Sequence, residues 1–158
     1  MNLFIKRKNF YLLTFIFSIF AIFFALYIEY ILQYKACKLC IYQRIPYIAA
    51  IFISLIGLNY LKNDKILILI IIIFLTSAVI SGYHYGIENN LIEEFSGCKN
   101  DTLGLLNKEK ILETFNNVAI SCKEVNFKIF GISLAGINLF LSLLIAIYSL
   151  RTLVYEKN

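Results

Sequence analysis

The sequence contains little charge, one proline and one histidine. Only 16% of its 158 residues are charged, whereas 60% are hydrophobic. Ordinary soluble domains are about 25% charged and about 45–50% apolar, so the composition excludes an ordinary soluble domain and a disordered chain. Lys and Arg outnumber Asp and Glu by 15 to 10. These basic residues do not cluster among exposed aromatic residues, which excludes a nucleic-acid-binding protein. The composition is typical of a membrane protein surrounded by lipid.

Four apolar runs are long enough to cross a bilayer. A hydrocarbon core of about 30 Å requires about 20 helical residues at a rise of about 1.5 Å each. Buried strands are much shorter than these runs, so we predict an all-α membrane protein, a four-transmembrane-helix bundle formed by a single domain over 1–158. The expected helices are 10–31, 45–61, 66–87 and 129–150, and the long loops are 32–44 and 88–128.

The charges outside the predicted helices are distributed unevenly between the two sides of the membrane. The segments 1–9, 62–65 and 151–158 hold seven Lys or Arg against two acidic residues, whereas the two long loops together with Glu29 hold eight of each sign. The whole net charge of +5 therefore belongs to one side. Because short cytoplasmic segments are enriched in Lys and Arg, we predict that both termini are cytoplasmic and both long loops are extracytoplasmic.

All four cysteines fall in the two predicted extracytoplasmic loops. Cys37 and Cys40 lie in the first loop, and Cys98 and Cys122 lie in the second. Thiols that only fill a core would be scattered through the helices instead. An even number of cysteines in an oxidising compartment favours disulfide chemistry.

Cys37 and Cys40 have the C-x-x-C spacing, which allows a small and readily reduced disulfide ring. Cys40 precedes the helix expected from residue 45, where free N–H groups and the cation of Arg44 would stabilise a thiolate. Pro46 is compatible with the first turn of that helix. A static disulfide remains a second interpretation of the pair. A zinc site is a third, but it lacks a second close cysteine pair and the loops are poor in histidine, so we expect no metal.

The string from residue 37 to 44, Cys-Lys-Leu-Cys-Ile-Tyr-Gln-Arg, resembles the C-x-L-C-[IY]-x-x-R signature of the disulfide bond formation protein B (DsbB) family. The four helices, the long second loop with two spaced cysteines, and the string FGISLAGINL also occur in the order of that family, so the resemblance covers nearly the whole chain. DsbB proteins are inner-membrane enzymes that use quinone to reoxidise the periplasmic dithiol oxidase DsbA. The resemblance therefore implies a quinone-reducing protein-disulfide oxidoreductase.

The same resemblance implies a location, a cofactor and a partner. The location is the bacterial inner (cytoplasmic) membrane, with the active site on the periplasmic face. The cofactor is a quinone, either ubiquinone or menaquinone, and the partner is a DsbA-like thiol oxidase.

The resemblance also implies a role for each cysteine. Cys98 and Cys122 would form the loop disulfide that meets the partner, and Cys98 would take the mixed disulfide. Cys122 would then exchange with Cys37, and Cys40 would be the thiolate beside the quinone ring. The exchange steps are attacks of a thiolate on a disulfide sulfur, and the cofactor supplies the final two-electron acceptor.

Arg44 and His84 are further candidates for the quinone site. Arg44 would donate a hydrogen bond to a quinone carbonyl, although an arginine at a helix end often only anchors the helix at the lipid headgroups. His84 is an ionisable group within a predicted span, which favours proton transfer, but a hydrogen-bonded interfacial histidine without function fits equally well. We expect Glu29 to be a solvated interfacial carboxylate.

Two packing features and two alternative functions complete the predictions. Segment 107–119 predicts a short amphipathic helix in the second loop, and Gly131 and Ala135 have a spacing that favours packing between membrane helices.

One alternative function is a vitamin K epoxide reductase-like enzyme, but there the loop cysteines precede a C-x-x-C near the last helix, the reverse of the order here. The other is a non-catalytic membrane scaffold stapled by disulfides.

Overall fold

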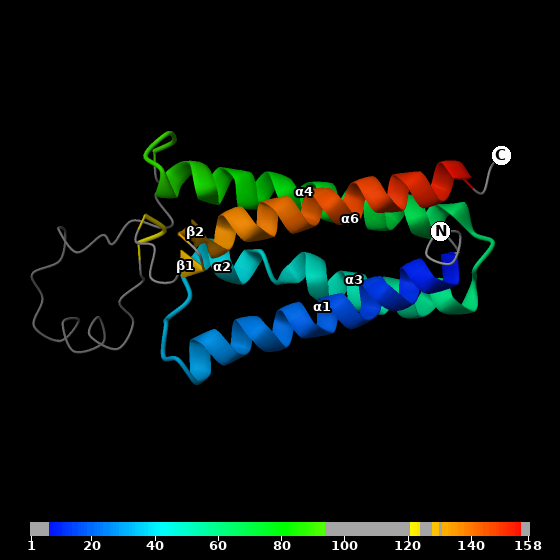
Figure 1. Cartoon of the computed structure of the whole chain (residues 1–158), viewed down its shortest axis with the longest axis horizontal. Coiled ribbons are helices and arrows are strands. Elements are labelled where there is room, and N and C mark those ends of the chain that lie inside the picture. Colours follow the sequence, from blue (N-terminus) through cyan, green and yellow to red (C-terminus); the bar gives the residue numbers. More distant parts are fainter. Residues whose placement is uncertain (1–6, 94–120, 124–127, 130, 156–158) are drawn as a thin grey trace, which may run out of the picture.

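The computed structural model describes residues 7–93, 121–123, 128–129 and 131–155 as a bundle of antiparallel helices (Figure 1). Within these ranges, four segments are long and apolar enough to cross a membrane, which confirms the predicted four-transmembrane-helix bundle. The predicted loop helix at 107–119 lies outside the described residues. The helices are α1 (Arg7–Tyr30), α2 (Lys38–Tyr42) and α3 (Ile45–Asn59), which together make the second span, α4 (Asp64–Glu88) and α6 (Leu134–Tyr155).

The helices pack as two pairs. Helix α1 lies mainly against α3, and α4 lies mainly against α6 (Figure 1). The start of α1, the end of α6 and the turn between α3 and α4 share one end of the bundle. Helix α2, the end of α4 and a short hairpin share the opposite end. The first cysteine pair therefore lies at the end of the bundle opposite the start of α1 and the end of α6.

The bundle carries its small polar residues inside and many large apolar residues outside. Large side chains such as Phe20, Phe23 and Phe52 are more than half exposed. Exposure of so many large apolar side chains is unfavourable in water and favourable in lipid. Small residues inside the bundle let membrane helices approach closely. Buried hydroxyls link the helices, as where Ser142 Oγ donates to Ser77 Oγ at 2.9 Å. The fully buried serines are Ser18, Ser54, Ser77, Ser81, Ser142 and Ser149.

The close approach of α1 and α3 depends on a glycine. A Cβ atom added at Gly57 would lie 2.7 Å from Cε1 of Tyr11, closer than real Cβ atoms come to a neighbour. Tyr11 itself is fully buried in the core cluster with Phe10, Tyr47 and Phe74. The aromatic ring therefore occupies the space that a larger residue at position 57 would need.

The second span begins earlier than the sequence analysis predicted. Residues Lys38–Tyr42 form helix α2 within the segment that we predicted to be a loop. Cys37 is the N-cap of α2, because its side chain accepts a hydrogen bond from the backbone N–H of Cys40. The helix is interrupted before α3, since Pro46 has no N–H to continue the backbone hydrogen bonds.

The last span begins later than predicted, at Leu134 rather than at residue 129. Strands β1 (Lys128–Ile129) and β2 (Ile132–Ser133) form an antiparallel hairpin in which Lys128 pairs with Ser133. Gly131 takes the positive φ of 83° that the turn requires, so it lies in this turn and not in a helix. The prediction that Gly131 and Ala135 form a helix-packing motif in the last span is therefore wrong. Ser133 Oγ then accepts from the N–H of Gly136 at 3.2 Å and caps α6.

Candidate active site

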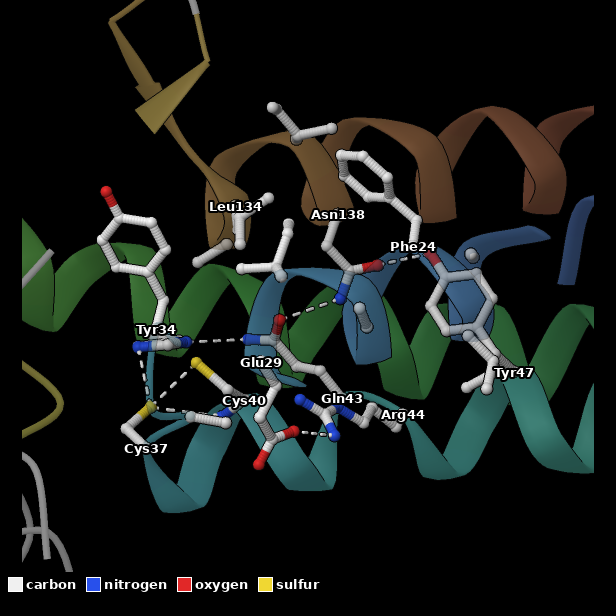
Figure 2. A pocket seen from close by; sticks show the side chains of 18 of the residues that line it. Phe24, Glu29, Tyr34, Cys37, Cys40, Gln43, Arg44, Tyr47, Leu134 and Asn138 are labelled. Atoms are coloured by element: carbon white, nitrogen blue, oxygen red, sulfur yellow. Dashed lines mark hydrogen bonds and ion pairs between the residues drawn. The ribbon is translucent and has the colours of Figure 1, made fainter. Parts of the chain in front are cut away.

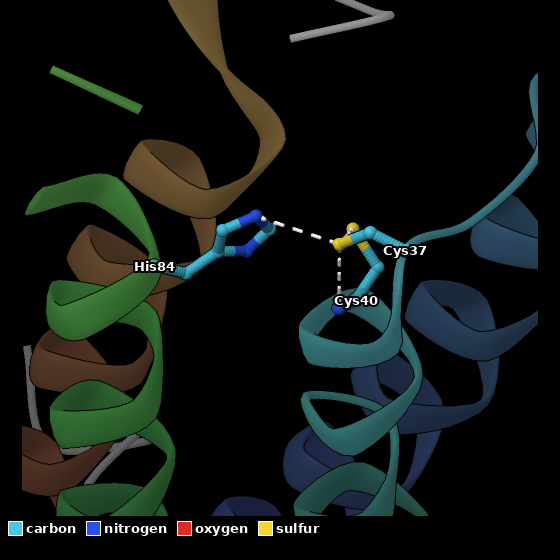
Figure 3. A group of neighbouring side chains, drawn as sticks. All are labelled: Cys37, Cys40 and His84. Atoms are coloured by element: carbon cyan, nitrogen blue, oxygen red, sulfur yellow. Dashed lines mark hydrogen bonds between the residues drawn. The ribbon is translucent and has the colours of Figure 1, made fainter. Parts of the chain in front are cut away.

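The first cysteine pair lies at the start of α2 (Figure 3). Cys37 and Cys40 are free thiols whose Sγ atoms are 3.0 Å apart. The backbone N–H of Cys40 points to Cys37 Sγ, at a nitrogen-to-sulfur distance of 3.3 Å. The free N–H groups of the helix therefore act on Cys37. The expectation that they act on Cys40 is wrong, because the helix begins directly after Cys37.

His84 reaches the cysteine pair from α4 (Figure 3). Its Nε2 atom lies 3.5 Å from Cys37 Sγ, and the residue is only 3% exposed. Glu88, one helical turn further on, has Oε1 at 3.6 Å from the same nitrogen. The backbone of Cys122 also hydrogen-bonds the ring. Of the two interpretations of His84, this contact favours a part in the thiol chemistry over an idle interfacial histidine.

The surroundings of Cys37 favour its thiolate form. The neighbouring Cys40 thiol, which hydrogen-bonds the Cys37 sulfur, lowers the pKa of Cys37 from the ordinary 9.0 to about 4. Burial opposes this lowering of the pKa, and the hydrogen bond with His84 adds to it. Because a thiolate is the form that attacks disulfides, Cys37 is prepared for exchange at neutral pH.

A series of side-chain hydrogen bonds leads from His84 to the far side of the site, and Figure 2 shows its part from Gln43 through Asn138 to Tyr47. Gln43 Nε2 lies 2.9 Å from His84 Nδ1, and Gln43 Oε1 accepts from Asn138 Nδ2 at 3.0 Å. Asn138 Nδ2 also donates to Ser81 Oγ at 2.7 Å, and Asn138 Oδ1 accepts from the hydroxyl of Tyr47. The series joins the second span to both α4 and α6.

Arg44 lies beside the cysteine pair and is paired with an acidic residue of α1 (Figure 2). Arg44 Nη1 lies 2.5 Å from Glu29 Oε2, and both side chains are mostly buried, with exposed fractions of 19% and 26%. The expectation that Glu29 is a solvated carboxylate is therefore wrong. The two residues meet because α1 ends beside the turn between α2 and α3.

A cavity of about 300 Å³ opens beside the cysteines. Its polar wall includes Cys37, Cys40 and Arg44 from the motif at residues 37–44, together with His84 from α4. The rest of its wall is largely apolar and comes from α1 and α6, with Phe17, Phe20, Phe24, Ile137 and Leu141 among its residues. The cavity can therefore take a mainly apolar molecule and hold its polar end against the thiols.

The same site offers three atoms of the kinds that bind transition metals. The sulfur atoms of Cys37 and Cys40 and a ring nitrogen of His84 all lie within 4.8 Å of one another. The sequence analysis disfavoured zinc partly because the loops lack histidine, but folding brings a histidine from a helix. The same three groups are also what a thiol pair with an acid-base partner requires.

The second cysteine pair is described in part. Cys122 is disulfide-bonded and 1% exposed, and it packs in one buried cluster with Cys37, Leu39 and Ile87. Cys98 lies outside the described residues. The structure therefore brings a disulfide-bonded cysteine of the second loop into the same cluster as a free thiol of the first.

This arrangement agrees with a comparison against known families. Residues 7–152 match the family model described as "Disulfide bond formation protein DsbB". The chain belongs to the DsbB family. An uncharacterized protein of Rickettsia prowazekii (strain Madrid E) is similar to this DsbB family member, with 35% identity over 158 residues that cover 97% of this chain and 90% of the relative.

Membership of the DsbB family decides several predictions. The resemblance stated from the motif is confirmed, and the vitamin K epoxide reductase-like alternative gives way to it. The chain is a multi-pass membrane protein whose family acts in disulfide bond formation, so its activity is that of a disulfide oxidoreductase.

The sequence analysis of this DsbB family member missed three residues of the site. Gln43 stands in the motif, but nothing was inferred from it, and Asn138 and Glu88 were not selected. Asn138 carried a usable signal, because an amide in an apolar membrane span requires a polar partner in the bundle. Glu88 gave little signal, because it stands at the boundary between the span and the loop.

Proposed function

We propose that this protein is a quinone-dependent thiol oxidase that reoxidises a periplasmic DsbA-like dithiol protein. One observation carries the proposal: a free cysteine pair opens into a largely apolar cavity whose wall also holds Arg44 and His84. If Cys37 and Cys40 only formed a static disulfide, no cavity beside them would be required. If the cavity only bound an apolar molecule, no cysteine with a lowered pKa would be required in its wall.

The residues around the cavity fit a quinone. A quinone ring is planar and apolar on its faces, with carbonyl oxygens that accept hydrogen bonds. The aromatic side chains of α1 supply an apolar wall, and Arg44 supplies a charged donor. Glu88 Oε2 is buried and has no hydrogen-bond partner in the part of the chain described, so the wall also holds an unused polar atom. Arg44 would hold a carbonyl, and either ubiquinone or menaquinone satisfies this chemistry.

The chain's own cysteines would carry the electrons in three balanced steps. In the first, the partner's two thiols reduce the Cys98 to Cys122 disulfide and become a disulfide themselves. In the second, the resulting thiols reduce a Cys37 to Cys40 disulfide by exchange. In the third, Cys37 and Cys40 form their S–S bond again and release two electrons and two protons. A bound quinone would supply the acceptor for both and leave as hydroquinone.

His84 and Arg44 would support the third step. The imidazole Nε2, at 3.5 Å from Cys37 Sγ, is placed to donate a hydrogen bond to the Cys37 thiolate, and Glu88 Oε1 lies 3.6 Å from the same nitrogen. Arg44 would stabilise negative charge that develops on a carbonyl oxygen. Its pairing with Glu29 orients the guanidinium in advance, which lowers the entropy lost on binding.

The test is an anaerobic titration of the purified protein with a reduced DsbA-like protein and with ubiquinone or menaquinone analogues. We expect one hydroquinone for each partner disulfide formed. Quinone absorbance measures the hydroquinone, and thiol counting measures the oxidation of the partner. Cys40→Ser is the matched control and should form no hydroquinone. The proposal is overturned if the wild-type protein leaves the thiols of the partner reduced in the presence of either quinone, or oxidises them without reducing quinone.

The proposal includes a location in the bacterial inner membrane with the cysteines on the periplasmic face. The +5 net charge on the segments at the opposite side supports this orientation. A membrane-impermeant thiol reagent should label all four cysteines in reduced, intact spheroplasts. Reactivity in detergent is the control. If Cys37 and Cys40 react only after the membrane is permeabilised, the protein has the opposite orientation.

A further inference from the structure

We propose that Gln43 is a positioning residue that holds the neutral His84 ring with its proton on Nε2, directed at Cys37. Asn138 would hold Gln43 in the orientation that this requires. The inference rests on the proposed function in one respect: it explains how the thiol pair of that oxidase meets its histidine. The tautomer itself is a property of the protein alone.

A backbone carbonyl can only accept, and this fixes the first hydrogen bond of the series. The hydroxyl of Ser81 donates to the carbonyl oxygen of Ser77 at 2.7 Å. A hydroxyl has one proton, so Ser81 Oγ acts as an acceptor toward its other neighbour, Asn138, at 2.7 Å. The atom of Asn138 that faces Ser81 must therefore be the NH₂ group. The carbonyl oxygen of the Asn138 amide is left to face Tyr47, whose hydroxyl donates to it.

The orientation of Asn138 determines the orientation of Gln43. The same NH₂ group of Asn138 points to the Gln43 amide at 3.0 Å, so the Gln43 atom that faces it must be the acceptor, Oε1. The NH₂ group of Gln43 then faces His84 Nδ1 at 2.9 Å. Because NH₂ only donates, Nδ1 must accept, and the single proton of the neutral ring is carried by Nε2. Nε2 is the nitrogen that lies 3.5 Å from Cys37 Sγ.

Burial makes this orientation specific. Gln43 is 8% exposed and His84 is 3% exposed, so solvent offers little alternative to either side chain. A rotated Gln43 amide would place NH₂ against the NH₂ of Asn138 and leave the chain of hydrogen bonds broken at its centre. The three residues come from the turn after α2, from α4 and from α6, so the packing of these elements sets the proton on the ring.

The experiment uses the fact that His84 is the single histidine of the chain. The reduced, full-length protein is labelled with ¹⁵N-histidine in detergent micelles at a pH where the ring is neutral. Long-range ¹H–¹⁵N correlations then identify which ring nitrogen carries the proton. We expect the Nε2-protonated pattern in the wild type. A proton on Nδ1 in the wild type would overturn the inference without the need for any variant.

Two variants test whether Gln43 sets this pattern. Gln43→Glu replaces the donor with a carboxylate, which accepts a hydrogen bond and should move the proton to Nδ1. Asn138→Asp leaves position 43 unchanged but faces it with an acceptor, so the Gln43 amide should rotate and produce the same shift through one intermediate residue. Gln33→Glu, at an exposed residue outside the site, is the matched control and should leave the pattern unchanged. Wild-type patterns in both site variants would overturn the inference.

The outcome is distinct from that of the quinone titration. The proton position is measured without partner or quinone, so the inference survives a wild type that does not turn over, and the proposed function survives a ring with the opposite tautomer. Circular dichroism and elution volume confirm that each variant is folded before its spectrum is compared.

Discussion

Cys37 and Cys122 belong to one buried cluster, although one is the free thiol at the start of α2 and the other is a disulfide-bonded cysteine of the second loop. The backbone of Cys122 also hydrogen-bonds His84, which itself lies 3.5 Å from Cys37 Sγ. Exchange between two cysteine pairs requires a thiol to reach a disulfide-bonded cysteine, and membership of one buried cluster places the two residues in the same region of the fold.

The first prediction is that the two pairs exchange through Cys37 and Cys122. In Cys40→Ser, with Cys98 held in a mixed disulfide by the partner, Cys37 and Cys122 each lack the cysteine with which they would otherwise form a disulfide. A disulfide between Cys37 and Cys122 should therefore accumulate, and mass spectrometry of peptides from the trapped complex detects it. If Cys122 stays a free thiol or stays bonded to Cys98 while the wild type turns over, the second pair is structural.

The second prediction concerns the pH dependence of Cys37. Its pKa of about 4 in the fold lies below the ordinary 9.0, so alkylation of the reduced protein by iodoacetamide should stay fast until the pH approaches about 4. Cys40→Ala removes the largest cause of the shift and should move the midpoint toward 9.0. Peptide mass spectrometry after timed alkylation measures both profiles, and a wild-type midpoint near the ordinary value would contradict the prediction.

The same shift predicts how the stability of the reduced protein depends on pH. Because the pKa of Cys37 is lower in the folded state than in the unfolded state, its thiolate stabilises the fold. This contribution is complete above a pH of about 9, declines as the pH falls, and is lost at about 4. The difference in unfolding midpoint between the reduced wild type and Cys37→Ala should therefore shrink as the pH falls toward about 4, and a difference that does not change with pH would contradict the prediction.

The third prediction is that Arg44→Ala weakens the use of quinone more than it weakens the fold. Hydrogen bonds to charged groups contribute about 1.5–3 kcal/mol, which corresponds to roughly ten- to a hundredfold in the quinone step. Arg151→Ala, at an exposed position in the last turns of α6, is the matched control. An unchanged rate and apparent affinity for quinone in a folded Arg44→Ala protein would leave the role of a headgroup anchor.

The fourth prediction tests the packing of α1 against α3. Gly57→Ala would place a Cβ atom 2.7 Å from the buried ring of Tyr11, so it should destabilise the protein by about 1–3 kcal/mol, as overpacking does. Gly82→Ala is the matched control, since its Cβ would lie 3.7 Å from Leu139 Cδ1 in ordinary contact. Thermal unfolding in one detergent should separate the two variants, and equal midpoints would contradict the close approach.

The sequence by itself determined the number of spans and the spacing of the first cysteine pair. Span number follows from the length and hydropathy of each run, because in lipid a helix must satisfy its own backbone hydrogen bonds. The C-x-x-C spacing of Cys37 and Cys40 likewise belongs to one short segment. The ends of the spans were less predictable, since caps such as Cys37 and Ser133 start helices at positions that hydropathy does not mark.

Only the tertiary structure decided which side chains meet at those cysteines. His84 faces Cys37, Glu29 pairs with Arg44, and Gln43 bonds to Asn138 because the helices have particular rotations about their axes and particular heights against one another. A membrane helix is apolar nearly all round, so its sequence carries no strong periodic signal that fixes these rotations. Small buried residues and interhelical hydrogen bonds fix them instead, and those act only when the helices are packed.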